Sequence, residues 1–336
     1  MSNLWETYLR KSLDHGNLLS LSLEITDFCN FNCVHCYKIR ESNYMSTDLF
    51  ERILDEACSL NVTSLSFNGG EPLKHKEINS FIEKALRRGL FVTVLSNGSE
   101  IKSIIDRDLL KSQALRWQIS LYGSDESSCQ EIIRRKGMWN RVIESLELLK
   151  ETGALASVTL SLLNVSGHDP RIALELIKKM GFRWQLTEII SVRENGDVFP
   201  HGYRPSDETI AEFYKYAPIE SNLVEECNLP GYACGAGVTT LAIKTNGDVL
   251  PCLTVNYFLG NIFENSVKTV LESGKLAEFR EMNRIPHDCR QCDFFDFCPR
   301  CPGIALMETG RINGVVKENC RIAAIKSKNL VYSEKK

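Results

Sequence analysis

The sequence predicts an α/β chain in two parts, a partial (β/α)6 TIM-like barrel followed by a small cysteine-rich α+β domain. Short β-type runs alternate with helical periodicity from Leu21 to about Ile190, and further on turn signals and cysteines replace that alternation. At 336 residues the chain is long enough for more than one core. We expect an extension over residues 1–20, the barrel over 21–215, the cysteine-rich domain over 216–325 and a tail over 326–336.

The β-type runs are the expected barrel strands. Between them apolar residues recur with the period of a helix, as on the faces that carry Phe50 and Leu54, and Ile78 and Ile82. Strands that alternate with helices form a parallel sheet through right-handed crossovers, and ligands bind beyond the C-terminal ends of its strands. The predicted strands are Leu21–Ile25, Ser64–Phe67, Phe91–Leu95, Trp117–Leu121, Ser157–Leu163 and Trp184–Ile190.

The second part is predicted from turns and cysteines. Asn-Gly pairs between β-type runs favour tight hairpins, which we expect at 195–196, 246–247 and 313–314. One short helix is expected around Val267 to Phe279, and cysteines crowd the region from Cys227 to Cys320. Because a small domain with little apolar core needs additional crosslinks for stability, we expect metal ligation to hold it together.

Composition excludes several classes of protein. The formal charge is -3 and no basic run occurs, so neither a nucleic acid nor an anionic membrane is an expected partner. The chain shows no signal peptide and no run of about 20 apolar residues, and we expect a cytoplasmic protein. Since a reducing compartment disfavours disulfides, the 13 cysteines indicate metal or cluster ligation.

A cysteine motif follows the first predicted strand directly. Cys29, Cys33 and Cys36 have the spacing C-x3-C-x2-C, and three thiolates so close in sequence can bind one corner of an iron–sulfur cubane. A fourth cysteine is missing from the motif, which leaves one iron open to an incoming molecule. A zinc site, or three unconnected thiols, are the alternatives to this interpretation.

Polar groups follow the next predicted strands. In Asn68-Gly69-Gly70-Glu71-Pro72 the glycines would let the backbone approach a ligand, and the carboxylate would suit a cationic amino group. Hydroxyl and amide groups that can bond a sugar are Ser96, Asn97 and Ser120, although Ser120 is equally consistent with a serine satisfied within the sheet. One of three arginines would reach a ligand carboxylate: Arg134, Arg135 or Arg141.

These motifs resemble the radical S-adenosylmethionine superfamily, whose signature C-x3-C-x-aromatic-C has His35 in the ring position here. Residues 69–72 are similar to its GGEP motif, and Ser96-Asn97 to its ribose-contacting turn. The resemblance implies a [4Fe-4S] cluster on the three cysteines and S-adenosyl-L-methionine bound to the open iron. Reductive cleavage would then give a 5'-deoxyadenosyl radical that abstracts a hydrogen atom from the substrate.

The downstream cysteines resemble a SPASM domain, an auxiliary-cluster extension found in peptide-modifying members of that superfamily. The gap between Cys298 and Cys301 holds two residues where the family normally has three. The resemblance implies two auxiliary [4Fe-4S] clusters, one on Cys289, Cys292, Cys298 and Cys320, the other on Cys234, Cys252 and Cys301 with Cys227 as its fourth ligand. Two zinc sites of four thiolates each would satisfy the same count.

Two cysteines remain. Cys58 lies on the apolar face of a predicted helix and is expected in the core. Cys129 lies in a polar loop after the fourth predicted strand, where a thiol would return a hydrogen atom to a substrate radical; a plain loop cysteine or a cysteine at a helix start fits the same position.

The expected function is a radical SAM maturase that modifies a ribosomally made peptide by oxidative crosslinking, excision or epimerisation. The alternatives are a sulfatase-type formylglycine maturase and a non-catalytic Fe-S or zinc protein. Expected partners are the precursor peptide and a reductant such as flavodoxin or ferredoxin. About twenty residues precede the first strand, too few for a peptide-binding winged helix, which favours a separate leader-peptide-binding protein.

Overall fold

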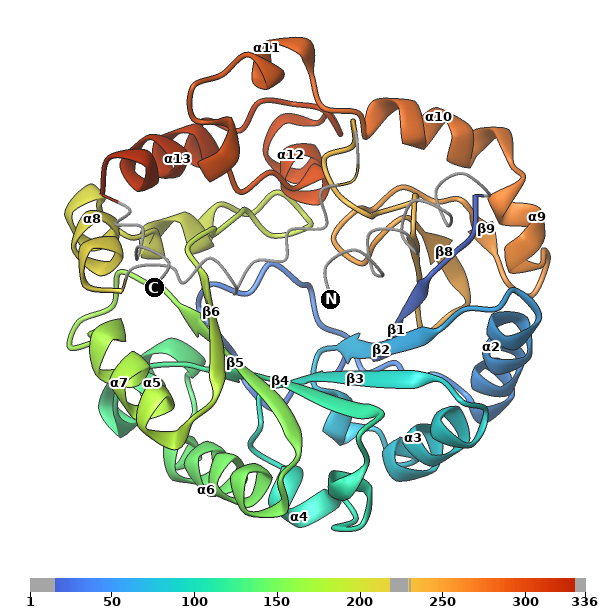
Figure 1. Cartoon of the computed structure of the whole chain (residues 1–336), viewed down its shortest axis with the longest axis horizontal. Helices are drawn as coiled ribbons and strands as arrows, with labels where there is room; N and C mark the ends of the chain where they lie inside the picture. The colour runs from blue at the N-terminus through green and yellow to red at the C-terminus, as the bar shows by residue number, and fades with distance from the viewer. Residues whose placement is uncertain (1–15, 218–228, 230, 330–336) are drawn as a thin grey trace, which may run out of the picture.

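A parallel sheet with helices packed on its outer face forms the first part of the molecule (Figure 1). The computed structural model describes residues 16–217, 229 and 231–329. Its first six strands lie in the order β6-β5-β4-β3-β2-β1, and every neighbouring pair is parallel. They are β1 (Ser20–Thr26), β2 (Ser64–Gly69), β3 (Phe91–Ser96), β4 (Leu115–Leu121), β5 (Leu155–Ser161) and β6 (Arg183–Thr187). The predicted partial barrel is confirmed.

The crossover helices bury apolar stripes against this sheet. Their caps follow from the sequence: Ser46 accepts a hydrogen bond from the Leu49 amide, and Asp125 forms a capping box with Ser128. The helices are α2 (Thr47–Ser59), α3 (Ile78–Arg87), α4 (Ile101–Ile104), α5 (Glu126–Ile133), α6 (Met138–Thr152), α7 (Pro170–Met180) and α8 (Asp207–Tyr216).

The two faces of the sheet differ in chemistry because side chains alternate along each strand. On β1, Leu21 and Leu23 are fully buried in the core, while Ser22 lies on the opposite, inner face. That inner face carries hydroxyl and amide groups that bond one another across strands. Asn68 Nδ2 donates to Ser22 Oγ at 2.9 Å. The inner face is therefore polar and suits a ligand better than a packed core.

The C-terminal part extends the same sheet. Strand β7 (Thr240–Ile243) pairs parallel with β1, and β8 (Asp248–Leu250) and β9 (Gly260–Asn261) follow as antiparallel neighbours. Apolar residues of both parts form one continuous core, which includes Leu23 of β1 and Phe279 of the C-terminal part. The remaining helices are α9 (Val267–Leu271), α10 (Gly274–Met282), α11 (His287–Arg290), α12 (Pro302–Thr309) and α13 (Lys317–Asn329).

Several local predictions for this second part need correction. The 246–247 hairpin is confirmed between β7 and β8, but 195–196 is a turn within a loop and 313–314 a turn between α12 and α13. The helix predicted around 267–279 is two helices, because Ser273 caps a new helix by accepting from the Leu276 amide. The prediction also missed α13. Among the described helices, none is both long and apolar enough to cross a membrane.

Candidate active site and thiol clusters

The cysteine motif forms a loop between the C-terminal end of β1 and the end of α5. The amides of Asn32 and Val34 donate to the carbonyls of Ile133 and Ile132 at 2.8 and 2.9 Å. The Phe31 amide donates to Cys29 Sγ at 3.4 Å. These bonds fix the loop on a rigid helix end, beyond the C-terminal end of the strand as predicted.

The three thiols of this loop lie within one another's electrostatic influence. Burial raises the pKa of Cys29 to about 11, and the charges of Cys36 and Glu71 also raise it. Burial likewise raises the pKa of Cys33, and the charges of Cys36 and Cys29 raise it further. Three thiolates together are therefore costly without a positive group, and binding a cationic metal centre would remove that cost.

Arg40 is the cation that the sequence analysis missed. Its guanidinium is hydrogen-bonded to the Cys36 side chain, and its charge lowers the pKa of both Cys29 and Cys33. The only sequence signal for this role was its position four residues after the last cysteine of the motif.

His35, in the ring position of the motif, is half-buried and neutral at pH 7. Burial lowers its pKa to about 4, and its ring lies 5.0 Å from that of Tyr122. The Nδ1 atom is buried and has no hydrogen-bond partner among the described residues.

The two glycines after β2 meet the cysteine loop. A Cβ on Gly69 would lie 1.8 Å from the Thr26 carbonyl oxygen, and one on Gly70 would lie 2.3 Å from that of Phe28. The Gly70 amide donates to the Thr26 carbonyl at 2.8 Å. The prediction assigned these glycines to ligand approach; in the structure they allow close approach of two protein backbones.

The Glu71 carboxylate is fully buried and bonded within the protein. It accepts from Ser96 Oγ at 2.7 Å, from the Asn97 amide at 2.7 Å and from the Leu73 amide at 3.0 Å. Burial raises its pKa to about 7, although these bonds lower it. The sequence predicts this carboxylate beside a ligand's amino group, and in the structure it ties the loop after β2 to the end of β3. Pro72, the next residue, is buried and begins a short 3-10 turn.

Asn97 extends this network to the cysteine loop. Its Nδ2 donates to Asn30 Oδ1 at 2.8 Å, and Asn30 Nδ2 donates to Ser99 Oγ at 3.0 Å. The ends of β1, β2 and β3 are thus held together by side chains as well as by the sheet. Asn30 and Ser99 were not predicted; each lies within one or two residues of a predicted site residue.

Other predicted residues have different surroundings. Ser120 lies half-buried on β4 and is hydrogen-bonded to Tyr122. Arg141 forms an ion pair with Glu100 at 3.3 Å and Arg134 one with Glu131 at 3.0 Å, while Arg135 is exposed.

Cys129 lies in helix α5 rather than in the predicted polar loop, because the capping box at Asp125 begins the helix there. Its side chain is in the core, 3% exposed, and burial raises its pKa to about 12. Cys58, which was expected in the core, is only half-buried.

Four thiols gather in the C-terminal part. Burial raises the pKa of Cys298 to about 11; Arg300 lowers it, and the charges of Cys320, Cys289 and Cys292 raise it. Burial, then the charges of Cys320 and Cys292, raise the pKa of Cys289. Three of the four cysteines that the resemblance assigns to one cluster, Cys289, Cys298 and Cys320, line one cavity.

Cys301 also lines this cavity, but the thiol charge that acts on it is a different one. Burial raises its pKa, and among nearby charges it is Cys252 that raises it further. The segment of Cys234 lies beside that of Cys252, because the Gly237 amide donates to the Pro251 carbonyl at 3.2 Å. The fourth predicted ligand, Cys227, lies outside the described residues.

These thiol groups fit iron–sulfur clusters in donor chemistry, since thiolate is the ligand that such clusters take. Within residues 16–217, 229 and 231–329, no three His, Cys, Asp or Glu side chains converge closely enough to hold a single metal ion. The chain thus combines a partial α/β barrel, a loop of three thiols beyond β1 and further thiols downstream. These features indicate an iron–sulfur protein built on a partial barrel.

Family comparisons agree with this geometry. Residues 23–184 match the family described as "Radical SAM superfamily", and residues 234–293 match "SPASM", an "Iron-sulfur cluster-binding domain". The chain belongs to the radical S-adenosylmethionine superfamily and carries a SPASM domain. It is therefore an enzyme of a superfamily that uses S-adenosylmethionine and an iron–sulfur cluster, and its SPASM domain implies auxiliary clusters.

Curated relatives span most of the chain at low identity. "Mycofactocin maturase MftC" of Mycolicibacterium smegmatis is 26% identical, over 83% of this chain and 76% of its own length. "AdoMet-dependent heme synthase" of Methanosarcina barkeri is 21% identical, over 86% and 93%. "PqqA peptide cyclase" of Granulibacter bethesdensis is 25% identical, over 82% and 79%.

Solved structures share the fold. Streptococcus suis SuiB bound to the precursor peptide SuiA superposes with a TM-score of 0.67 and 19% identity, covering 94% of this chain and 79% of SuiB. At this identity the match supports the fold alone.

Proposed function

We propose that the chain is a peptide maturase. It cleaves S-adenosylmethionine reductively and abstracts a hydrogen atom from a ribosomally made peptide, which installs a post-translational modification. The observation that carries this proposal is the loop of Cys29, Cys33 and Cys36 beyond β1, joined to the ends of β2 and β3 by Gly70, Glu71 and Asn97.

Each thiol group receives a role in this proposal. The three cysteines of the loop hold the first cluster, which when bound supplies the electron that cleaves the sulfonium of S-adenosylmethionine. His35 would lie beside it, and the backbone of residues 69–72 with Ser96, Asn97 and Ser120 would bind the cofactor. The auxiliary clusters are held by Cys289, Cys292, Cys298 and Cys320, and by Cys234, Cys252 and Cys301 with Cys227.

Glu71 acts in this proposal through other groups. Its carboxylate accepts hydrogen bonds from Ser96 and Asn97. It therefore orients the loops that would contact the cofactor and is a positioning residue. Burial raises the pKa of the half-buried Tyr37, and the charges of Cys252 and Cys36 raise it further. Tyr37 is therefore near one cysteine of the loop and one of the C-terminal part.

A peptide is the substrate class that we favour. A relative named "PqqA peptide cyclase" supports it, and the similar structure of SuiB was solved with the precursor peptide SuiA. The inner face of the sheet offers neutral donors and acceptors, such as Gln118 and Gln185, which both donate to Thr159 Oγ1 at 3.2 and 2.7 Å. Such groups suit peptide amides better than charged substrates.

The organisation and partners follow from the same proposal. The catalytic unit comprises residues 21–215 and the auxiliary-cluster unit 216–325, consistent with the family matches inside each. A flavodoxin or ferredoxin supplies electrons and a separate protein binds a leader peptide. A cytoplasmic compartment keeps the thiols reduced.

The test uses a peptide encoded next to this gene. Anaerobically reconstituted enzyme, dithionite and S-adenosylmethionine should convert it, with mass spectrometry as the readout. A loss of two daltons indicates a crosslink, a larger loss excision, and a mass change only in deuterated solvent epimerisation. Conversion of a short Cys- or Ser-containing sulfatase peptide, and of no neighbouring peptide, would contradict the proposal in favour of a formylglycine maturase.

A further inference from the structure

Arg300, between Cys298 and Cys301, has an aromatic and a carbonyl contact but no counter-ion. Its Nη1 donates to the Phe295 carbonyl at 2.6 Å, and its guanidinium carbon lies 3.7 Å from the centre of the Phe295 ring. The Nε atom is buried and has no partner, and no ion pair in the described part of the chain includes Arg300. The guanidinium is therefore fixed in place while one donor is unused.

The surroundings of Arg300 supply no carboxylate. It lines a cavity of about 60 Å³ together with Cys289, Cys298, Cys301 and Cys320, and none of the residues that line this cavity is Asp or Glu. A half-buried cation without an anion is unfavourable, because desolvation is not offset by any attraction. The anion that belongs in this cavity must come from a group that the thiols bind.

Arg284 lines the same cavity and, unlike Arg300, has a charged partner. Its guanidinium also stacks on an aromatic ring, that of Tyr232 at 4.9 Å. Unlike Arg300, it has a carboxylate partner, since its Nε donates to Glu281 at 2.9 Å. The two arginines share the cavity and the aromatic stacking and differ in the counter-ion.

We propose that Arg300 is the counter-ion and hydrogen-bond donor of the auxiliary cluster held by Cys289, Cys292, Cys298 and Cys320. A four-thiolate [4Fe-4S] cluster is an anion, and one added electron makes it more negative by one charge. No bond forms or breaks in that step; an external reductant such as dithionite supplies the electron. Arg300 stabilises the reduced state more than the oxidised one, and so raises the reduction potential of this cluster. The inference rests on the ligand assignment proposed above.

The test is a redox titration of the reconstituted full-length chain, followed by electron paramagnetic resonance. A background in which Cys29, Cys33 and Cys36 are alanine would remove the first cluster and leave the auxiliary signals. In this background Arg300→Met should lower the midpoint potential of one auxiliary cluster and leave the other unchanged. We expect at least a tenfold smaller equilibrium constant for reduction, which is about 59 mV for one electron.

Two further variants make the test specific. Arg300→Lys keeps the charge but loses the planar Nε donor, and should shift the potential by less than Arg300→Met. Arg284→Met is the matched control and should leave both potentials unchanged. An unshifted potential in Arg300→Met, at full iron and sulfide content, would overturn the inference.

Failure of the ligand assignment gives a different result. Cys298→Ala should remove the iron of one cluster, and unchanged iron and an unchanged signal would show that the assignment itself is wrong. If Arg300→Met loses iron, the midpoint potential is measured in Arg300→Lys instead. A Lys variant with full iron content and an unshifted midpoint potential would also overturn the proposed donor role.

Discussion

The buried Glu71 carboxylate accepts a 2.7 Å hydrogen bond from the hydroxyl of Ser96 at the end of β3. Its second oxygen accepts from the amide of Asn97, and Asn97 in turn holds Asn30 inside the cysteine motif. A carboxylate that contacts no solvent thus joins three strand ends where the cofactor would bind. Disturbing this network should affect stability and the geometry of the cysteine loop together.

Glu71 should make stability depend on pH. Its pKa is raised by burial to about 7 from the ordinary 4.5, so the folded state binds the proton more tightly than the unfolded state. The stabilisation is therefore complete below pH 4.5 and is lost as the pH rises toward 7, by about 3 kcal/mol at most. Urea unfolding of the metal-free chain at pH 5 and pH 7.5 should show higher stability at pH 5, and Glu71→Gln should reduce that difference. If Glu71→Gln and the unmodified chain show the same pH dependence of stability, Glu71 is not the group that causes it.

Gly70→Ala should displace the cysteine loop. The new Cβ would lie 2.3 Å from the Phe28 carbonyl oxygen, so one of two backbones must move. We expect a loss of about 1–3 kcal/mol in unfolding free energy and reduced iron content after reconstitution. Gly202→Ala is the control, because a Cβ there meets nothing within 4 Å. Equal iron content and stability in the two variants would show that the tight contact has no consequence.

Cys129→Ala should leave turnover of the peptide within about twofold, with a loss of about 1 kcal/mol in stability from the core. The thiol is 3% exposed, which fits packing in the core better than hydrogen-atom donation to a substrate. The measurement is product formation beside 5'-deoxyadenosine formation, with Cys58→Ala as the control. Normal cleavage of S-adenosylmethionine without peptide product would instead identify Cys129 as a hydrogen donor.

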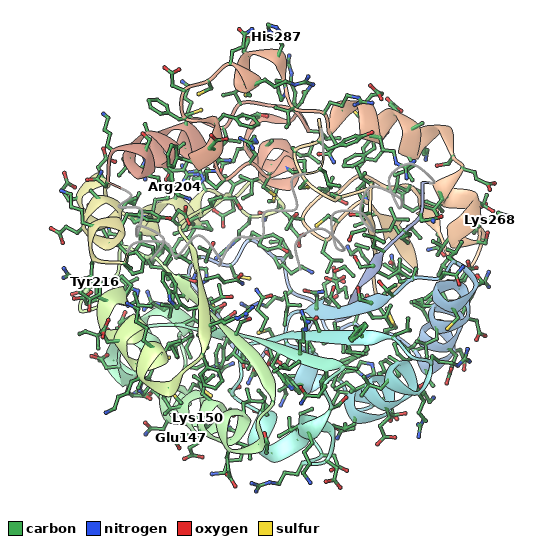
Figure 2. The ribbon with its side chains drawn as sticks, viewed as in Figure 1. Glu147, Lys150, Arg204, Tyr216, Lys268 and His287 are labelled. Atoms are coloured by element: carbon green, nitrogen blue, oxygen red, sulfur yellow. The ribbon has the colours of Figure 1, made fainter. Side chains whose placement is uncertain are left out.

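Glu308 links the C-terminal helices to the loop after β6. It accepts from Arg204 Nη2 at 2.7 Å and from the Val192 amide at 3.0 Å, and Arg204 lies where that loop meets the helices (Figure 2). Glu308→Gln should cost about 2 kcal/mol, because hydrogen bonds to a largely buried charge are lost. Denaturant midpoints measure this. Glu151→Gln in the exposed pair with Arg107 should change stability by less than about 0.5 kcal/mol, and an equal loss in both variants would contradict the role of burial.

Local sequence patterns predicted the barrel strands and the cysteine loop because alternation and spacing are properties of neighbouring residues. Pairing between distant segments was not visible: nothing in the sequence indicated that β7 would join β1. The partners of Glu71 were equally hidden, since a position at a strand end does not reveal which donors meet a carboxylate. Cys129 lies near the start of α5, which is the helix-start alternative, because Asp125 caps that helix.

Cys29, Cys33 and Cys36 together should bind the cluster that cleaves S-adenosylmethionine. The direct measurement is 5'-deoxyadenosine released under dithionite by anaerobically reconstituted protein, beside its iron and sulfide content. The intact chain should release it, and the variant with all three cysteines replaced by alanine should lose one cluster's iron and release none. If the triple variant releases 5'-deoxyadenosine at the rate of the intact chain, these three cysteines do not hold the cluster that cleaves S-adenosylmethionine.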